Sequence, residues 1–165
     1  MSVTRVVVLD SMVVDTFLDD PAAFALAVSA TADGRLRMLS THVTADEVAK
    51  LQHNPERRAG LLRVLDELTQ QVPTAGFILD VSRLDEAMLN DDVETLEVLR
   101  SRNPGKHSED ALIAATAQFH GAALVTNERR LAGRARECGI EVLTSGELLA
   151  ELQDHPADAA GSTDE

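Results

Sequence analysis

Short runs of apolar, often β-branched residues alternate along this chain with longer stretches in which apolar residues recur every three or four positions. The first pattern is typical of strands and the second of amphipathic helices. The unbroken apolar run from Val6 to Leu9 predicts a strand buried on both faces, as at the centre of a parallel sheet. The predicted strands cover residues 5–9, 36–40, 77–81, 122–126 and 140–143. The predicted helices cover residues 11–18, 21–32, 41–51, 55–71, a segment around 93–99, 108–119, 128–137 and 145–152.

The predicted helix ends carry residues with distinct backbone preferences. Pro21 and Pro55 each follow a capping residue, Asp20 or Asn54, and proline fits the first position of a helix. Gly139 ends the helix predicted at 128–137. Because predicted strands and helices alternate, the sequence predicts an α/β fold with a mainly parallel sheet.

The length of 165 residues suits one compact domain, which we place at residues 1–152. Residues 153–165 contain no large apolar side chain, so burial cannot offset the entropy lost on ordering them. We therefore expect residues 153–165 to form a disordered acidic tail.

The chain has 28 acidic and 15 basic residues and a formal net charge of −13. This charge excludes proteins that bind duplex DNA by bulk attraction to its phosphates. The chain also lacks Trp and Tyr, on which many single-strand binders stack bases. The exception to the acidic character is residues 100–136, which contain seven basic and three acidic residues.

The cysteine content and the hydropathy of the chain indicate in which cellular compartment the protein works. The single cysteine, Cys138, cannot form an internal disulfide or a cysteine-based zinc site, which is typical of a reducing cytosol. The first apolar run, residues 6–9, is too short for a signal peptide, and no stretch of 18 uninterrupted apolar residues occurs. We expect a cytoplasmic protein without membrane contact.

Acidic residues lie where parallel sheets bind ligands, just beyond the carboxyl ends of the strands. Asp10 ends the first predicted strand, and Glu47 lies about one helical turn after the second. Glu128 follows the strand at 122–126, and Asp110 opens the helix that leads into that strand. Carboxylates that converge repel one another unless a cation lies among them or some are protonated. Oxygen ligands, with no cysteine nearby and no histidine at a ligand spacing, favour Mg²⁺ or Mn²⁺ over zinc.

Three of these acids also have a purely structural interpretation. Glu47 is spaced to complete a capping box begun by Thr44. Asp110 and Glu128 fall in predicted first helical turns, where the helix dipole favours negative charge. Asp10 is harder to explain in this way, because an acid directly after a buried strand costs free energy unless it is paired or binds a metal.

Four segments are similar to motifs of one known family: residues 6–11, 44–48, 109–117 and 124–131. The third is the most specific, because an acid is followed by Ala-Leu-Ile-Ala-Ala-Thr-Ala and, shortly afterwards, by an apolar strand that ends in Thr-Asn. In these motifs the chain resembles the PIN-domain nucleases, particularly the VapC-like toxins of type II toxin-antitoxin systems. The resemblance implies a PIN-like three-layer sandwich, in which helices flank a central, mainly parallel sheet of four to five strands.

The resemblance also implies a divalent-metal-dependent endoribonuclease that hydrolyses phosphodiester bonds of single-stranded or structured RNA with Mg²⁺ or Mn²⁺. It implies a cognate antitoxin and a homodimer. The implied metal-binding and catalytic residues are Asp10, Glu47, Asp110 and Glu128, supported by Thr126 and Ser11. The basic segment flanks these acids, and the residues we expect to contact RNA phosphates are Arg129, Arg130, Lys106 and Arg102.

Two other classes of protein with acids at the ends of parallel strands fit the sequence less well. A haloacid-dehalogenase-like phosphatase requires an acid where Met12 stands, and a response-regulator receiver requires a strand-end acid where Asp46 lies in a predicted helix. The main alternative is a catalytically weakened PIN-like module that acts by binding a partner. It is motivated by Glu128, because the family usually has Asp at this position and the additional methylene moves the carboxylate outward by about one bond length.

Overall fold

The computed structural model describes residues 3–51, 53–75, 87–88 and 108–155. The helices are α1 (Ser11–Asp19), α2 (Pro21–Ala32), α3 (His42–Ala49), α4 (Pro55–Leu68), α6 (Ser108–Phe119), α7 (Arg129–Glu137) and α8 (Ser145–Asp154). The strands are β1 (Arg5–Leu9), β2 (Leu36–Ser40), β3 (Thr69–Gln71), β4 (Thr74–Ala75), β5 (Ala87–Met88), β6 (Ala123–Val125) and β7 (Val142–Leu143).

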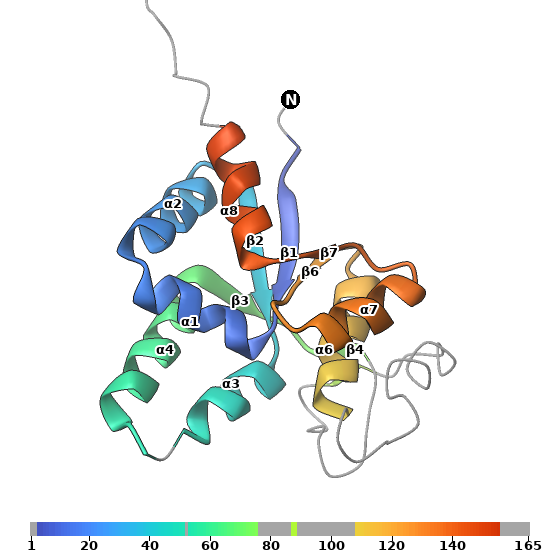
Figure 1. Cartoon of the computed structure of the whole chain (residues 1–165), viewed down its shortest axis with the longest axis horizontal. Coiled ribbons are helices and arrows are strands. Elements are labelled where there is room, and N and C mark those ends of the chain that lie inside the picture. The colour runs from blue at the N-terminus through green and yellow to red at the C-terminus, as the bar shows by residue number, and fades with distance from the viewer. Residues whose placement is uncertain (1–2, 52, 76–86, 89–107, 156–165) are drawn as a thin grey trace, which may run out of the picture.

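A five-stranded sheet with the order β3-β2-β1-β6-β7 forms the centre of the fold (Figure 1). Its neighbouring strands are parallel throughout, with Val8 of β1 opposite Leu39 of β2 on one side and Leu124 of β6 on the other. β1 is therefore the central strand, as its unbroken apolar run predicts. β4 and β5 form a separate parallel pair.

Helices cover both faces of this sheet. Alternate residues of β1 point to opposite faces, so Val7 and Leu9 join one core and Val8 joins the other. The first core is formed with α1, α2, α4 and α8, and the second with α6 and α7. Figure 1 shows α6 and α7 on the other side of β1 from α1, α2 and α8. The predicted three-layer α/β sandwich with a parallel sheet is confirmed.

Capping explains several of the helix boundaries. The Asp20 side chain accepts hydrogen bonds from two backbone N–H groups at the start of α2, and Asn54 accepts one from Arg57 at the start of α4. Gly139 has a φ of +75° just after α7, a left-handed conformation that favours glycine. These three boundaries agree with the sequence patterns.

The helix predicted at 55–71 is too long. α4 ends at Leu68, and Thr69–Gln71 form β3, which pairs in parallel with Met38–Ser40 of β2. The apolar spacing of Leu68 and Val72 imitates a further helical turn, but pairing with the sheet edge overrides it. The Thr69 hydroxyl, which donates to the Leu65 carbonyl oxygen at 2.6 Å, closes the last turn of the helix.

Two other differences concern the ends of predicted elements. α8 continues to Asp154, two residues beyond the boundary placed at 152, while residues 156–165 of the expected tail lie outside the described residues. The predicted strand at 77–81 and the helix around 93–99 also lie outside them. In the described part of the chain, no helix is both long and apolar enough to cross a membrane.

Candidate active site

The carboxyl edge of the sheet is where the predicted acids were expected to meet. Asp10 directly follows β1, Glu47 lies in the helix that follows β2, and Glu128 lies between β6 and α7. α6 leads into β6, so it must run in the opposite direction to that strand, and its first turn with Glu109 and Asp110 begins at the same edge. Four separate chain segments therefore place carboxylates at one edge of the sheet.

Asp10 is the most deeply buried of these acids, with 3% of its surface exposed. Its Oδ2 accepts a 2.8 Å hydrogen bond from the Thr126 hydroxyl, and its Oδ1 accepts one of 3.4 Å from the Ser11 hydroxyl. Burial raises the pKa of Asp10, the bonds from Thr126 and Ser11 oppose that rise, and the negative charge of Glu128 adds to it. Asp10 and Glu128 therefore repel each other across the site.

Thr126 connects the end of β6 to two of the acids. Besides donating to Asp10, its Oγ1 accepts a hydrogen bond of 3.1 Å from the backbone N–H of Glu128. Glu128 is the N-cap residue of α7, yet its side chain makes no capping hydrogen bond. Its carboxylate therefore does not cap the helix, and Thr126 fixes the backbone from which that carboxylate extends.

Glu47 is half-buried in α3, and its Oε2 atom is buried without a hydrogen-bond partner among the described residues. Burial raises the pKa of Glu47 to about 7, a contact with Ser11 lowers it in part, and the carboxylates of Glu109 and Asp10 raise it further. The expected capping box with Thr44 is absent. α3 begins earlier, with Thr41 as its N-cap, and the Thr44 hydroxyl instead donates to the carbonyl oxygen of Leu9.

Glu109 was not among the predicted site residues, although it stands next to Asp110. It is paired with Lys50 at 2.9 Å and lies against Glu47. Burial acts to raise the pKa of Glu109, but hydrogen bonds with Lys50 and Glu47 and the positive charge of Lys50 lower it overall. The only feature of the sequence that pointed to Glu109 as a site residue was its position next to Asp110. The same position also suggests an acid that is favoured by the helix dipole in the first turn of α6, without a role in the site.

Asp110 lies partly buried in the first turn of α6, with 18% of its side chain exposed. Its Oδ2 is 3.4 Å from Nη2 of Arg134 in α7, and the Arg134 side chain is 14% exposed. The residues predicted to contact RNA differ from Arg134 in their exposure or lie outside the described part of the chain. Arg129 and Arg130 are exposed in the first turn of α7, and Arg102 and Lys106 lie outside the described residues.

The donor atoms of this site fit a hard divalent cation. Within residues 3–51, 53–75, 87–88 and 108–155, no group of three or more His, Cys, Asp or Glu side chains is already arranged as a metal site. A bound Mg²⁺ or Mn²⁺ would give the Oε2 of Glu47 a partner and would relieve the repulsion of Asp10 by Glu128 and of Glu47 by Asp10.

The raised pKa of Glu47 makes the stability of the metal-free protein depend on pH. In the unfolded chain Glu47 loses its proton near its usual pKa of 4.5, but in the folded chain it does so only near 7. The folded state therefore loses stability as the pH rises through that range. Because Glu47 is only partly buried, we expect a loss of about 1–2 kcal/mol.

The measurement is chemical unfolding of the metal-free protein between pH 4.5 and 8. The variant Glu47→Gln should show a smaller loss of stability and should be more stable than the natural protein at pH 8, whereas Glu67→Gln, an exposed change on α4, should show the full loss. Equal pH slopes for the natural protein and Glu47→Gln would contradict this origin of the pH dependence.

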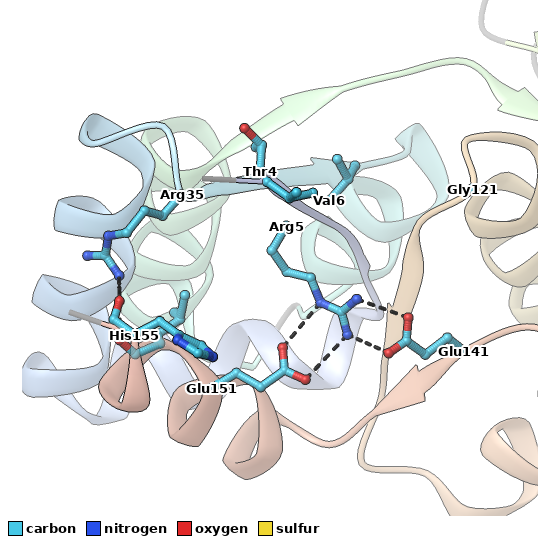
Figure 2. A pocket seen from close by; sticks show the side chains of 10 residues that line it. Thr4, Arg5, Val6, Arg35, Gly121, Glu141, Glu151 and His155 are labelled. Atoms are coloured by element: carbon cyan, nitrogen blue, oxygen red, sulfur yellow. Dashed lines mark hydrogen bonds and ion pairs between the residues drawn. The ribbon is translucent and has the colours of Figure 1, made fainter. Parts of the chain in front are cut away.

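A cavity of about 690 Å³ opens at the opposite, amino edge of the sheet (Figure 2). Its charged groups are already paired: Arg5 contacts Glu141 at 2.6 Å and Glu151 at 3.2 Å, and Arg35 donates to the His155 carbonyl oxygen at 2.8 Å. These bonds connect β1 to α8 and to the residue before β7, and they connect the loop before β2 to the C-terminal end of α8. None of the acids at the carboxyl edge lines this cavity.

Three solved structures are similar to this chain over most of its length. PAE2754 from Pyrobaculum aerophilum is 20% identical, with a TM-score of 0.56 over 92% of this chain and 99% of that one. VapBC2 from Rickettsia felis, solved bound to a DNA fragment from its promoter, is 13% identical, with a TM-score of 0.53 over 85% and 98%. The PIN domain endonuclease Utp24 is 16% identical, with a TM-score of 0.49 over 84% of each chain.

No protein-family model matches the chain, and no curated protein sequence matches it. At these levels of identity, the likeness to PAE2754 and VapBC2 shows the fold alone. The chain therefore has a PIN-like fold, as the motifs of its sequence predict.

Proposed function

We propose that this protein is a divalent-metal-dependent endoribonuclease whose active site is the carboxyl edge of the sheet. The observation that carries the proposal is the electrostatic repulsion between buried and half-buried carboxylates that come from separate segments of the chain. Asp10 is buried beside Glu128, and its charge also raises the pKa of Glu47, which has an unpartnered buried oxygen. A protein keeps such a repulsive arrangement at a cost to its stability, and this is characteristic of functional sites.

In the proposed reaction, Asp10 and Asp110 would hold the principal metal ion, and Glu47 and Glu128 would complete its surroundings. The bound ion would lower the pKa of a water molecule and neutralise charge on the phosphate. Glu47, whose half-buried carboxylate is close enough to Asp10 for the two charges to interact, would accept the proton of the attacking water. The Thr126 hydroxyl keeps Asp10 and the backbone of Glu128 in register.

Calorimetric titration of the protein with Mn²⁺ tests the site without requiring the right RNA. We expect the natural protein to bind Mn²⁺, Asp110→Asn to bind it at least about tenfold more weakly, and Asp66→Asn, an exposed change on α4, to bind it normally. No binding, or binding that is indifferent to Asp110, would contradict the proposal and favour the alternative of a partner-binding module without metal chemistry.

Arg129 and Arg130 are proposed to bind RNA phosphates beside the site. Both are exposed in the first turn of α7, where positive charge opposes the helix dipole, so they are not placed there to stabilise the helix. The double variant Arg129→Ala with Arg130→Ala should weaken binding of a single-stranded oligoribonucleotide by about tenfold, with a shallower dependence on salt.

The same double variant should bind Mn²⁺ as the natural protein does. Fluorescence anisotropy of a labelled oligoribonucleotide at several salt concentrations, together with the Mn²⁺ titration, measures both properties. Unchanged RNA affinity in the double variant would remove these two arginines from the proposed interface.

The finer part of the proposal is that the protein is the toxin of a toxin-antitoxin pair, cytoplasmic and homodimeric, and held inactive by an antitoxin. The similarity to VapBC2 supports the pairing. The net charge of −13 favours association with a basic antitoxin segment, because opposite charges steer the encounter. The alternative of a weakened module rests on Glu128, and it predicts poor metal binding and no cleavage of any RNA.

A further inference from the structure

Arg134 is set apart from the other basic residues of α7 by its burial. Its side chain is 14% exposed, whereas Arg129, Arg130 and Arg136 are exposed. It lies six residues beyond Glu128 and contacts Asp110 of α6, so it brings a positive charge against one of the acids of the proposed site. A guanidinium group this close to a proposed metal ligand competes with the metal for the same carboxylate.

The contact between Arg134 and Asp110 is weak in its geometry. The Nη2 to Oδ2 distance of 3.4 Å is long for a charge-assisted hydrogen bond, which is usually 2.7–2.9 Å. The Nε atom of Arg134 is buried and has no hydrogen-bond partner among the described residues, so it does not join Nη2 in the forked pair that arginine forms with carboxylates. Arg134 therefore compensates the negative charge of Asp110 without forming a short, two-pronged ion pair with it.

We infer that Arg134 is an internal counter-ion for Asp110 in the metal-free protein, and that the divalent ion displaces it when it binds. The released guanidinium then takes an oxygen of the substrate phosphate, because a planar fork of N–H donors matches phosphate as it matches carboxylate. The inference rests on the proposed function and adds a residue whose partner changes between the metal-free and the working states.

The placement of Arg134 supports this exchange of partners. Glu128 is the N-cap residue of α7, so the helix that carries Arg134 starts next to one of the site acids, and the guanidinium of Arg134 contacts Asp110. When the ion occupies Asp110, a positive charge beside it is repelled unless it finds another anion, and the phosphate of the substrate provides one. Lys50 is 65% exposed and paired with Glu109. Because its ammonium group is well solvated, Lys50 competes only weakly with a metal ion for the Glu109 carboxylate.

The test compares Mn²⁺ binding by the natural protein, Arg134→Gln and Arg136→Gln, measured by calorimetry with the metal alone. Arg134→Gln should bind Mn²⁺ about three- to tenfold more tightly, because the competing cation has been removed. Arg136→Gln removes the same charge from an exposed position of the same helix and should stay within about twofold of the natural protein. Equal or weaker binding by Arg134→Gln would overturn the inference.

The second measurement is RNA cleavage at saturating Mn²⁺. Arg134→Gln should have a kcat/KM lower by about ten- to a hundredfold despite its tighter metal binding, and Arg136→Gln should not. Cleavage by Arg134→Gln at the natural rate would overturn the contact with phosphate.

Arg134→Lys and the natural protein serve as controls, which distinguish a failure to fold and a failure of the proposed function from a failure of this inference. If Arg134→Gln does not fold, Arg134→Lys is the replacement, because it keeps the positive charge but loses the forked N–H donors of arginine. Its Mn²⁺ affinity should be higher than that of the natural protein and of Arg136→Gln. It should be lower than the affinity expected for a site with no charge at position 134. Affinity of Arg134→Lys below that of the natural protein would overturn the inference. If the natural protein itself binds no Mn²⁺, the proposed function fails first, and that result is distinct from unaltered affinity in the variants.

Discussion

Replacing Asp10 with asparagine is expected to lower metal-dependent RNA cleavage by at least about a hundredfold and, at the same time, to make the metal-free protein more stable. Cleavage falls because a buried carboxylate at the end of β1 is proposed to hold the metal ion. Stability rises because burial raises the pKa of Asp10, and a group of this kind costs stability once the pH exceeds that pKa. Asparagine has the same shape without the charge.

Cleavage is measured with an oligoribonucleotide in Mn²⁺, and stability by thermal unfolding in a metal chelator at pH 8. The exposed change Asp66→Asn should alter neither property. A variant Asp10→Asn that is inactive but less stable would show that Asp10 is mainly a structural residue, and an active variant would contradict the proposed function.

Replacing Thr126 with valine should lower cleavage by about ten- to a hundredfold and destabilise the protein by about 1–3 kcal/mol. Valine has nearly the same shape as threonine but no hydroxyl. It would leave the Oδ2 of Asp10 without its 2.8 Å donor and the backbone N–H of Glu128 without its acceptor, in a place where Thr126 is only 1% exposed. Buried polar groups without partners are costly.

Serine at position 126 is the matched control, because it restores the hydroxyl and removes only a methyl group. Thr126→Ser should recover most of the cleavage activity and should lose only the stability that the methyl contributes. Urea unfolding and cleavage kinetics measure the two effects. If valine and serine reduce activity equally, packing of the side chain matters here and its hydrogen bonds do not.

The fold could be predicted from the sequence to a large extent, because its signals are local. The apolar run of β1 indicates a central strand of a parallel sheet, and Asp20, Asn54 and Gly139 mark helix ends by their own side-chain or backbone chemistry. The end of α4 could not be read in this way. Thr69–Gln71 are drawn out of a helical pattern by pairing with β2, a partner some 30 residues away.

The sequence could place four of the acids of the candidate site at one edge of the sheet, but it missed Glu109 and could not predict the contacts. The positions of Asp10, Glu47, Asp110 and Glu128 relative to the strands and helices follow from alternating strands and helices. The prediction of a capping box between Thr44 and Glu47 was wrong, because α3 begins before Thr44 and the Thr44 hydroxyl donates to the carbonyl oxygen of Leu9.

By itself the sequence determined the layers, the central strand and the edge of the sheet at which the acids lie, since these depend on hydrophobic periodicity and on the direction of parallel strands. Only the tertiary structure decided which charges meet. The pairing of Glu109 with Lys50, the closeness of Glu109 to Glu47, and the contact of Arg134 with Asp110 join side chains from separate elements. Their energies depend on burial and distance, which no local pattern of residues encodes.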